Sequence, residues 1–187
     1  MLAARDLFER DGFRATTLAA ISARADISVE GIYKTFGSKA ALAKAVFDVV
    51  VAGDDEPVAV AERPEAAAVH AEPDLHAKIR LFAEGLAQRQ ARSAKVQILV
   101  RDGRHVDASL EPVWAELAEE GLAGMAGLAR HLASTSHIRA GLDVDRMRDV
   151  LWNYLAIDHY ERLVLHRNWT LDAYTQWLTA AITNAIT

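Results

Sequence analysis

The sequence contains no cysteine, which excludes disulfide bonds and thiolate metal sites. It has only four prolines and ten glycines, whereas alanine and leucine are abundant, and this favours helix over strand. No stretch alternates regularly between apolar and polar residues as a half-buried strand does. There is no run of about 18 apolar residues to cross a membrane, and early acidic residues interrupt any signal peptide. We therefore expect a cytoplasmic protein that does not contact a membrane.

The composition is typical of a soluble globular protein, with 51% hydrophobic and 25% charged residues. The net charge of −5 is unevenly distributed. Residues 1–47 hold seven Lys/Arg and five Asp/Glu, a balance of +2, and residues 48–187 hold 14 and 21, a balance of −7. A mildly basic N-terminal segment on an acidic remainder agrees with a head that faces nucleic acid, although many packing domains show as much.

The most informative segment lies within the first 40 residues. Thr17 is suited to cap a helix over residues 18–25, Asp26 is a plausible turn residue, and Ser28 and Ser38 are suited to cap two further helices. Two helices joined by a tight turn form a helix-turn-helix, and a second helix of about eight residues, roughly 12 Å long, fits a major groove. The pattern alone is equally compatible with a helical hairpin that only packs.

A set of residues at fixed spacing extends this pattern in both directions. It comprises Ala3-Ala4-Arg5-Asp6-Leu7-Phe8, Gly12-Phe13, Thr16-Thr17, Ile21, Ala25, Ile27-Ser28, Gly31-Ile32-Tyr33, Phe36 and Ser38-Lys39-Ala40-Ala41-Leu42. With this spacing and no gap, the segment resembles the N-terminal domain of the TetR family of bacterial transcriptional regulators. Asp26 departs from the family pattern, which usually has glycine in the turn.

The rest of the chain also reads as helices. The first helix of the chain should cover residues 2–11 and stop at Gly12, and the acidic, proline-containing segment 53–73 should be a loop with one short helix. Further helices are expected over 74–91, over 93–101, from a cap at Ser109 past Leu132, over 143–166, and from a cap at Thr170 to the end. The last two helices are too apolar to be covered within one subunit, so a two-fold dimer with a four-helix bundle should cover them.

The resemblance implies an all-α fold: a three-helix helix-turn-helix DNA-binding head over 1–47, followed by a multi-helix ligand-binding and dimerisation body over 48–187. It implies that Thr17, Tyr33, Thr35 and Lys39 contact phosphates, while residues 29–31 and Lys34 reach base edges. The full predicted DNA-binding set is Thr17, Ser28, Val29, Glu30, Gly31, Tyr33, Lys34, Thr35 and Lys39. Two assignments have alternatives: Glu30 can accept from cytosine or serve only the helix dipole, and Lys34 can donate to guanine or contact phosphate.

The resemblance also implies a pocket in the body for a small-molecule effector. Its candidate walls are Phe82, Leu86, Trp114, Met125, Trp152 and Tyr154, although aromatic and methionine residues at helical spacing are more often plain core. The candidate dimer contacts are Asp158, His159, Leu163, Tyr174, Trp177, Leu178 and Ala181. Of these, Asp158 and His159 could instead orient a ligand.

We therefore expect a ligand-responsive, sequence-specific transcriptional regulator, a repressor released by a small molecule from a near-palindromic DNA operator. The alternative is a helical ligand-binding module whose helix-turn-helix no longer binds DNA. No nucleophile motif, phosphate-binding loop or HExxH sequence is present. An all-helical enzyme is the competing class, but we expect no catalytic residue, cofactor or metal.

Overall fold

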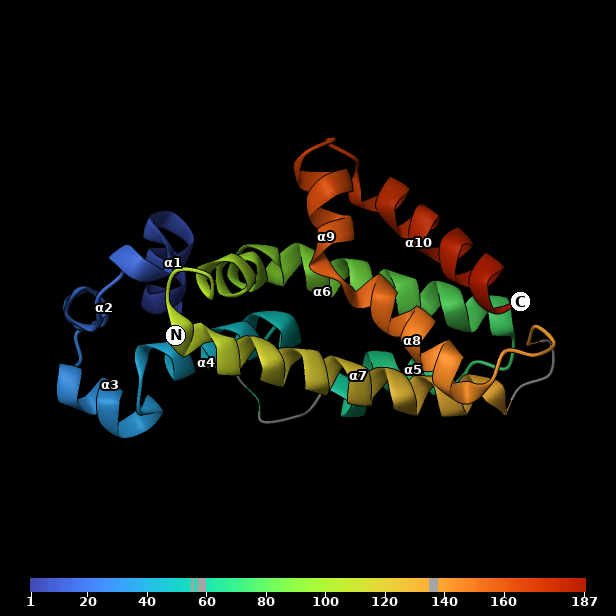
Figure 1. Ribbon diagram of the computed structural model, residues 1–187, viewed down its shortest axis with the longest axis horizontal. Coiled ribbons are helices and arrows are strands. Elements are labelled where there is room, and N and C mark those ends of the chain that lie inside the picture. The colour runs from blue at the N-terminus through green and yellow to red at the C-terminus, as the bar shows by residue number, and fades with distance from the viewer. Residues whose placement is uncertain (55, 57–59, 135–137) are drawn as a thin grey trace. The chain divides into compact units, whose positions relative to one another are not determined.

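The computed structural model describes residues 1–54, 56, 60–134 and 138–187. These residues form α-helices α1 to α10 with short helical turns between some of them, and no strand occurs among them (Figure 1). The chain divides into unit 1, Met1–Glu56 with Arg92–Leu117, and unit 2, Pro57–Ala91 with Ala118–Thr187. The predicted all-α fold is confirmed. The predicted division after residue 47 stays a prediction, and the structure adds residues 92–117 to the N-terminal unit.

Unit 1 begins with a helix that bends at a glycine. Gly12 in α1 (Leu2–Ala15) has φ 79 and ψ 170, a backbone conformation that glycine adopts without steric cost. The predicted left-handed break of this helix at Gly12 is confirmed, and a further short helical turn follows it as far as Ala15. The unit continues through α2 (Leu18–Ala25), α3 (Val29–Phe36), α4 (Lys39–Ala52), the end of α6 (Leu75–Gly103), η2 (Ala108–Leu110) and the start of α7 (Glu111–Ala133).

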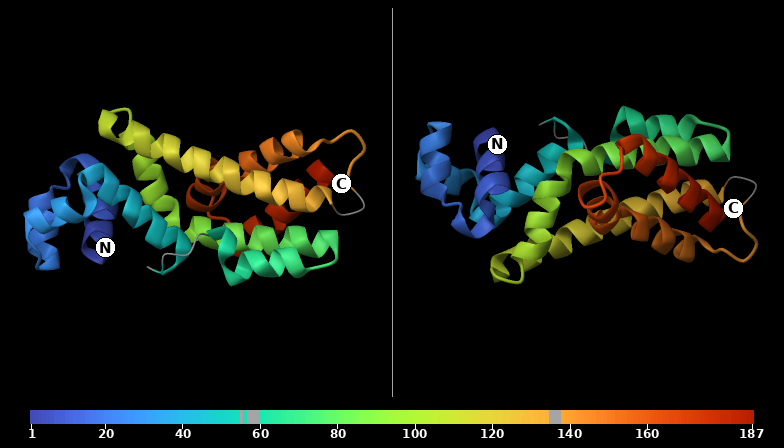
Figure 2. Two further views of the ribbon diagram at one scale, coloured as in Figure 1. Left: turned by 90° about the horizontal axis from the view of Figure 1, so that it is seen from below. Right: turned by 90° about the horizontal axis from the view of Figure 1, so that it is seen from above.

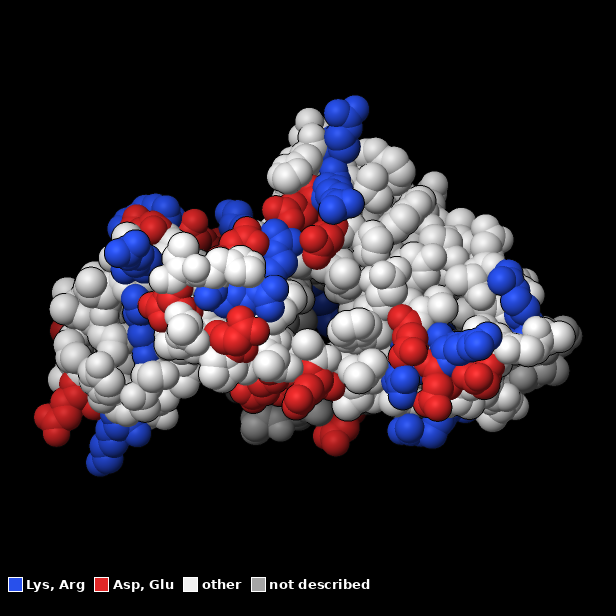
Figure 3. All heavy atoms as spheres, viewed as in Figure 1, with Lys and Arg blue, Asp and Glu red and all other residues white. Residues whose placement is uncertain are grey.

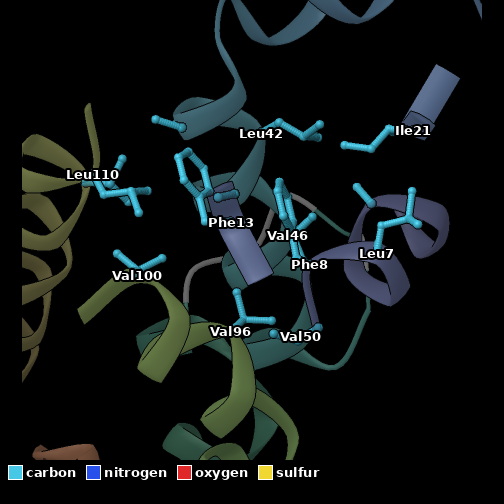
Figure 4. Close-up of a cluster of buried hydrophobic side chains, with 14 of the residues drawn as sticks. Leu7, Phe8, Phe13, Ile21, Leu42, Val46, Val50, Val96, Val100 and Leu110 are labelled. Carbon is cyan, nitrogen blue, oxygen red and sulfur yellow. The ribbon is translucent and has the colours of Figure 1, made fainter. Parts of the chain in front are cut away.

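The core of unit 1 joins residues that are far apart in the sequence. Phe8 and Phe13 stack with ring centroids 5.8 Å apart. Around them lie side chains from α4, α6 and η2, among them Val46, Val50, Val96, Val100 and Leu110 (Figure 4). Three short helices bury little apolar surface by themselves, so the segment 92–117 completes a core that the first 56 residues alone would leave open.

Unit 2 consists of η1 (Val60–Glu62), α5 (Pro64–Ala71), the first part of α6, the rest of α7, α8 (Val144–Leu155), α9 (Ile157–Tyr160), the π-helical turn η3 (Glu161–Leu165) and α10 (Leu171–Ile186). α5 lies beside the first half of α6 (Figure 2), and α10 packs against α8. The short helix predicted within 53–73 is α5, and the part of that prediction at residues 55 and 57–59 lies outside the described residues.

Two predicted helix boundaries are wrong. The helices expected over 74–91 and 93–101 are one continuous helix of 29 residues, α6, because the intervening QARSA sequence contains neither glycine nor proline to interrupt it. The cap ahead of α7 is Asp107 rather than Ser109: the Asp107 carboxylate accepts the backbone N–H of Ser109 at 3.1 Å and its hydroxyl at 2.6 Å. The cap predicted at Thr170 is confirmed, since its hydroxyl oxygen accepts the N–H of Ala173.

The helix predicted over 143–166 is interrupted at Ala156, where ψ is 123. The break leaves the Leu155 carbonyl without a helical donor, and the Gln90 amide donates to it at 3.3 Å. The Tyr174 hydroxyl in turn donates to the Gln90 carbonyl oxygen at 2.8 Å. Gln90 and Tyr174 are both buried, and this burial raises the pKa of Tyr174. Polar contacts from α6 therefore compensate a break that the local sequence does not encode.

A second polar cluster joins α5, α6 and α7 within unit 2. The buried Lys78 ammonium group donates to the carbonyls of Val69 and His70, at 3.1 and 3.0 Å. It also lies 2.9 Å from Nε2 of His131, whose ring packs on that of His70 with centroids 4.4 Å apart. Because an ammonium group only donates, Nε2 of His131 is the acceptor. Burial first, and then the charges of Lys78 and His70, lower the pKa of His131.

We predict that His131→Gln reduces the loss of stability on acidification. The folded-state pKa of His131 lies below its ordinary value of 6.5, so the unfolded chain binds more protons as the pH falls through this region and unfolding becomes easier. Glutamine keeps an acceptor and does not titrate. Thermal unfolding followed by circular dichroism between pH 7 and pH 5 should show a smaller fall in Tm for His131→Gln than for the wild type. His105→Gln, an exposed histidine of unit 1, is the matched control, and parallel profiles for all three proteins would contradict the assignment.

Candidate nucleic-acid interface

Three side-chain caps define the helices of the helix-turn-helix. The Thr17 hydroxyl oxygen accepts the backbone N–H of Ala20 at 3.1 Å at the start of α2. Ser28 accepts the N–H of Gly31 at 3.0 Å at the start of α3, and Ser38 caps α4 in the same way. All three caps predicted from the sequence are confirmed. The caps fix where each helix starts, and other N–H groups of each first turn have no intrahelical partner.

The turn between α2 and α3 depends on Asp26. Its φ of 54 and ψ of 43 place it in the left-handed region, which reverses the chain in a single residue. The Ser22 carbonyl accepts the backbone N–H groups of both Asp26 and Ile27. Asp26 is thus the turn residue that the sequence predicts, in a conformation that a side chain other than glycine adopts only at some cost.

Helix α3 has one buried side and one open side. Ile32 is 1% exposed and belongs to the core of unit 1. On the opposite side Glu30 and Lys34 are exposed, and Tyr33 is 54% exposed. Three of the predicted contact residues therefore share the solvent face of a helix anchored through its other face. This is the arrangement that a recognition helix requires.

The remaining α3 residues of the predicted set have structural tasks as well. A Cβ atom at Gly31 would lie 3.1 Å from the Ser28 hydroxyl oxygen, so glycine leaves room for the cap that Ser28 forms. The Thr35 hydroxyl donates to the Gly31 carbonyl at 2.9 Å, which already uses its proton. Val29 is half-buried, whereas Ser28 and Thr35 are exposed.

Lys39 differs most from the sequence-based picture. It is half-buried, and its ammonium group donates to the carbonyls of Phe13 and Thr16, at 2.8 and 3.0 Å. Thr16 itself is 1% exposed, and its hydroxyl is placed to donate to the carbonyls of Leu7 and Gly12. Sequence reasoning did not assign a role to Thr16, although a threonine just beyond the end of α1 is a residue type that bonds local backbone groups.

Charge on unit 1 is mixed. Figure 3 shows acidic and basic side chains interspersed on its visible face, and Arg24 pairs with Asp6 at 2.8 Å on the exposed surface. Such exposed pairs contribute little to stability. They do reduce the positive potential that the seven basic residues of the segment 1–47 would otherwise present.

The six predicted ligand contacts do not form one group. Trp114 lies in unit 1, where the Cζ atom of Arg104 is 5.1 Å from the centroid of the Trp114 ring. The other five residues lie in unit 2. Phe82, Leu86 and Met125 are buried, Tyr154 is half-buried, and Trp152 is 42% exposed. Two open depressions of about 490 and 590 Å³ lie along α6 and α10, and neither is lined by any of the six.

The predicted dimer contacts divide between the interior and the surface of unit 2. Tyr174 and Leu178 are completely buried within one chain, so their side chains pack inside the subunit and do not reach its surface. For these two residues the prediction of a partner contact is wrong. Trp177 stacks on Tyr174 at 5.7 Å and remains half-buried. The other predicted contacts, Asp158, His159, Leu163 and Ala181, are also half-buried.

Residues 1–46 match the family of bacterial regulatory proteins called the tetR family. The N-terminal domain is a TetR-family domain. The whole chain is also similar in fold to a solved structure from Mesorhizobium loti MAFF303099, a protein assigned to the TetR-family transcriptional regulators. That likeness covers 98% of this chain and 91% of the other, with a TM-score of 0.71 and 16% identity. The chain matches none of the curated proteins with which it was compared.

The TetR match falls on the residues that carry the resemblance seen in the sequence, so that resemblance is confirmed. It ends at residue 46, within α4. Beyond it, the likeness at 16% identity concerns the fold. Among the described residues, no helix has both the length and the apolar character needed to cross a bilayer, and no three His, Asp or Glu side chains are grouped so as to hold a metal ion.

We predict that Asp26→Gly stabilises the protein by up to about 1 kcal/mol, because glycine removes the steric cost of the left-handed conformation. The greater conformational entropy of glycine in the unfolded chain offsets part of this gain. Asp26→Ala should be destabilising, since alanine keeps the Cβ atom and loses the polar side chain. Urea unfolding of the two variants and the wild type measures both effects. An Asp26→Gly protein less stable than Asp26→Ala would show that the turn is not strained.

Proposed function

We propose that the protein is a homodimeric, sequence-specific DNA-binding transcriptional regulator of bacteria that represses its target and is released from DNA by a small molecule. The observation that carries this proposal is the α3 helix, with Ile32 buried beneath it and Glu30, Tyr33 and Lys34 open to solvent. This open face lies between two helix starts that are capped by Ser28 and Ser38. The TetR-family match over residues 1–46 supports the same reading.

In this proposal the contacts divide by chemistry. The helix starts capped by Thr17 and Ser38 offer backbone N–H groups to phosphates. Tyr33 offers a hydroxyl to a phosphate. Glu30 and Lys34 lie one turn apart on the exposed side, where a carboxylate can accept from cytosine and an ammonium group can donate to guanine. Phosphate contacts fix the register, and base contacts then decide the sequence.

Dimerisation is proposed from the surface of α10. The helix has one charged residue, Asp172, in its 16 positions. Figure 3 shows the surface over α10 nearly free of charged atoms. Tyr174, Leu178, Ile182 and Ile186 face inward, which leaves half-buried residues such as Trp177 and Ala181 for a partner. A helix face with so little charge suits a two-fold interface, and two recognition helices would then read half-sites one helical turn, about 34–36 Å, or a multiple of it apart.

Regulation is proposed to act through a shift of population. An effector that binds unit 2 more tightly in a geometry that does not fit DNA would favour release. A coupling of about 1–3 kcal/mol is enough to change DNA affinity 5- to 150-fold. The helix α4 is the proposed lever, because it starts beside α3 and its later residues Val46 and Val50 lie in the shared core of unit 1.

The deciding experiment is selection of binding sites from random double-stranded DNA with the purified full-length protein. The expected result is an enriched near-palindromic sequence whose retention falls steeply as salt is raised. A screen of small molecules for release from that sequence follows. The balance of only +2 over residues 1–47 favours a second candidate, a ligand-binding module that has lost DNA binding. That candidate predicts no enrichment and no salt-dependent retention.

We predict that Lys34→Ala and Tyr33→Phe have different consequences for binding. Lys34→Ala should relax preference at one base position, removing about 1–3 kcal/mol of discrimination. Tyr33→Phe should weaken binding to all sequences alike, by about 1 kcal/mol, because it removes one hydrogen bond to a phosphate. Binding measured against a set of single-base variants of the selected site separates the two effects.

The control for these variants is Arg146→Ala, which removes a positive charge from α8 in unit 2. It should leave both affinity and base preference unchanged. A uniform loss for Lys34→Ala would reassign Lys34 to a phosphate, and an altered base preference for Tyr33→Phe would overturn its phosphate assignment.

A further inference from the structure

Lys39, the first residue of α4, directs its side chain toward backbone and not toward solvent. Its Nζ atom donates to the Phe13 carbonyl at 2.8 Å and to the Thr16 carbonyl at 3.0 Å. The same atom lies 4.2 Å from the centroid of the Phe13 ring, which adds a cation–π contact. Two of the three N–H donors of the ammonium group are therefore bonded, and one face of the group rests on an aromatic ring.

The two acceptors occupy a critical place in unit 1. Phe13 follows the non-helical Gly12 in the short final turn of α1, where carbonyl groups have no helical donor. Thr16 follows directly, is buried, and is held from its other side by the hydrogen bonds of its own hydroxyl. The next residue is Thr17, the cap of α2. Lys39 thus bonds the backbone from which α2 begins.

Lys39 is also placed at the other end of the helix-turn-helix. Gly37 caps the end of α3 and Ser38 caps the start of α4, so Lys39 is the third residue beyond α3. A negative charge lies near the ammonium group: Asp107, whose pKa is lowered mainly by its hydrogen bonds from Ser109, and further by the charges of Lys39 and Arg14. A lysine that already bonds two carbonyls beside a ring and a carboxylate has fewer free N–H donors for a phosphate than a lysine on an exposed helix.

We propose that Lys39 is a positioning residue of the DNA-binding head and not a phosphate ligand. Its side chain connects the start of α2 to the start of α4 and so fixes the segment that carries α3 between them. This inference rests on the proposed DNA-binding function and corrects the sequence-based expectation that the Lys39 side chain binds phosphate. The backbone N–H groups at the start of α4 remain free for that contact.

The test compares the full-length wild type with Lys39→Met, which keeps a similar apolar stem without the charge, and Lys39→Gln, which keeps two N–H donors without the charge. Affinity for the selected DNA is measured over a range of salt concentrations. For Lys39→Met we expect a roughly tenfold loss of affinity with an unchanged slope of log affinity against log salt. Loss of a phosphate contact would instead reduce that slope by about 0.9 per subunit, which would overturn the proposal.

Measurements on the protein without DNA give an independent readout. If Lys39 positions α2, Lys39→Met should lower Tm and speed amide hydrogen exchange at Ala20 and Ile21, whose N–H groups bond the Thr17 hydroxyl and carbonyl, and Lys39→Gln should restore part of both. A phosphate ligand leaves these properties of the free protein unchanged, so unaltered exchange and Tm in Lys39→Met would also overturn the proposal. Lys34→Met is the matched control, because it removes an ammonium group from the exposed face of α3.

The two arms keep this inference separate from the proposed function. If the wild type binds no DNA at low salt, the proposed function fails, and the exchange measurement still decides whether Lys39 holds α2. If the wild type binds DNA and Lys39→Met changes only the salt slope, the proposed function stands and the positioning role fails.

Discussion

The structure of unit 1 depends on one apolar contact, the packing of Phe8 and Phe13 against Val46 of α4 and against Val100 and Leu110 from the later part of the chain. The first 56 residues supply four helices but not enough apolar surface to close a core around them. Segment 92–117 supplies what is missing, which is why the compact unit is discontinuous in sequence. A change in the conformation of the α6–α7 connection should therefore also change the stability of the DNA-binding head.

From this core the geometry of the open helix face follows. Ile32 anchors α3 on one side only, so the side chains on the other side are positioned by helix geometry alone. The caps at Ser28 and Ser38 set where α3 begins and where α4 takes over, and the left-handed Asp26 sets the angle at which the chain enters α3. The interface is precise because each of its borders is fixed by a local hydrogen bond that the core holds in place.

Much of this could be predicted from the sequence, because it is encoded locally. Ser and Thr before an apolar helical pattern indicate a cap wherever they occur, and Thr17, Ser28 and Thr170 all form one. The break at Ala156 could not be predicted, since alanine is the strongest helix former and the compensating donor, Gln90, lies 65 residues before its acceptor Leu155. The direction of the Lys39 side chain was equally hidden, because a lysine at a helix start can reach solvent or backbone with the same local sequence.

The same reasoning explains which site residues were misplaced. An apolar face on α10 is visible in the sequence, but its spacing does not say whether the face meets the same chain or another one. Tyr174 and Leu178 turn inward because α6 and α8 already cover them, whereas the sequence alone suggested a shortage of covering elements. Apolar residues that recur every 3.6 positions identify the buried face of a helix. They do not identify the element that covers this face.

The hydrogen bonds of the Gln90 amide restrict which substitutions the interior of unit 2 can accept during evolution. The amide accepts from the Tyr174 hydroxyl in a buried contact and donates to the part-buried Leu155 carbonyl. An apolar replacement at position 90 alone would leave the buried Tyr174 hydroxyl and the part-buried Leu155 carbonyl without this partner, and Tyr174→Phe alone would leave the Gln90 carbonyl oxygen without its donor. We therefore expect positions 90 and 174 to change together among homologues. Homologues that lack this pair should have a continuous helix through position 156.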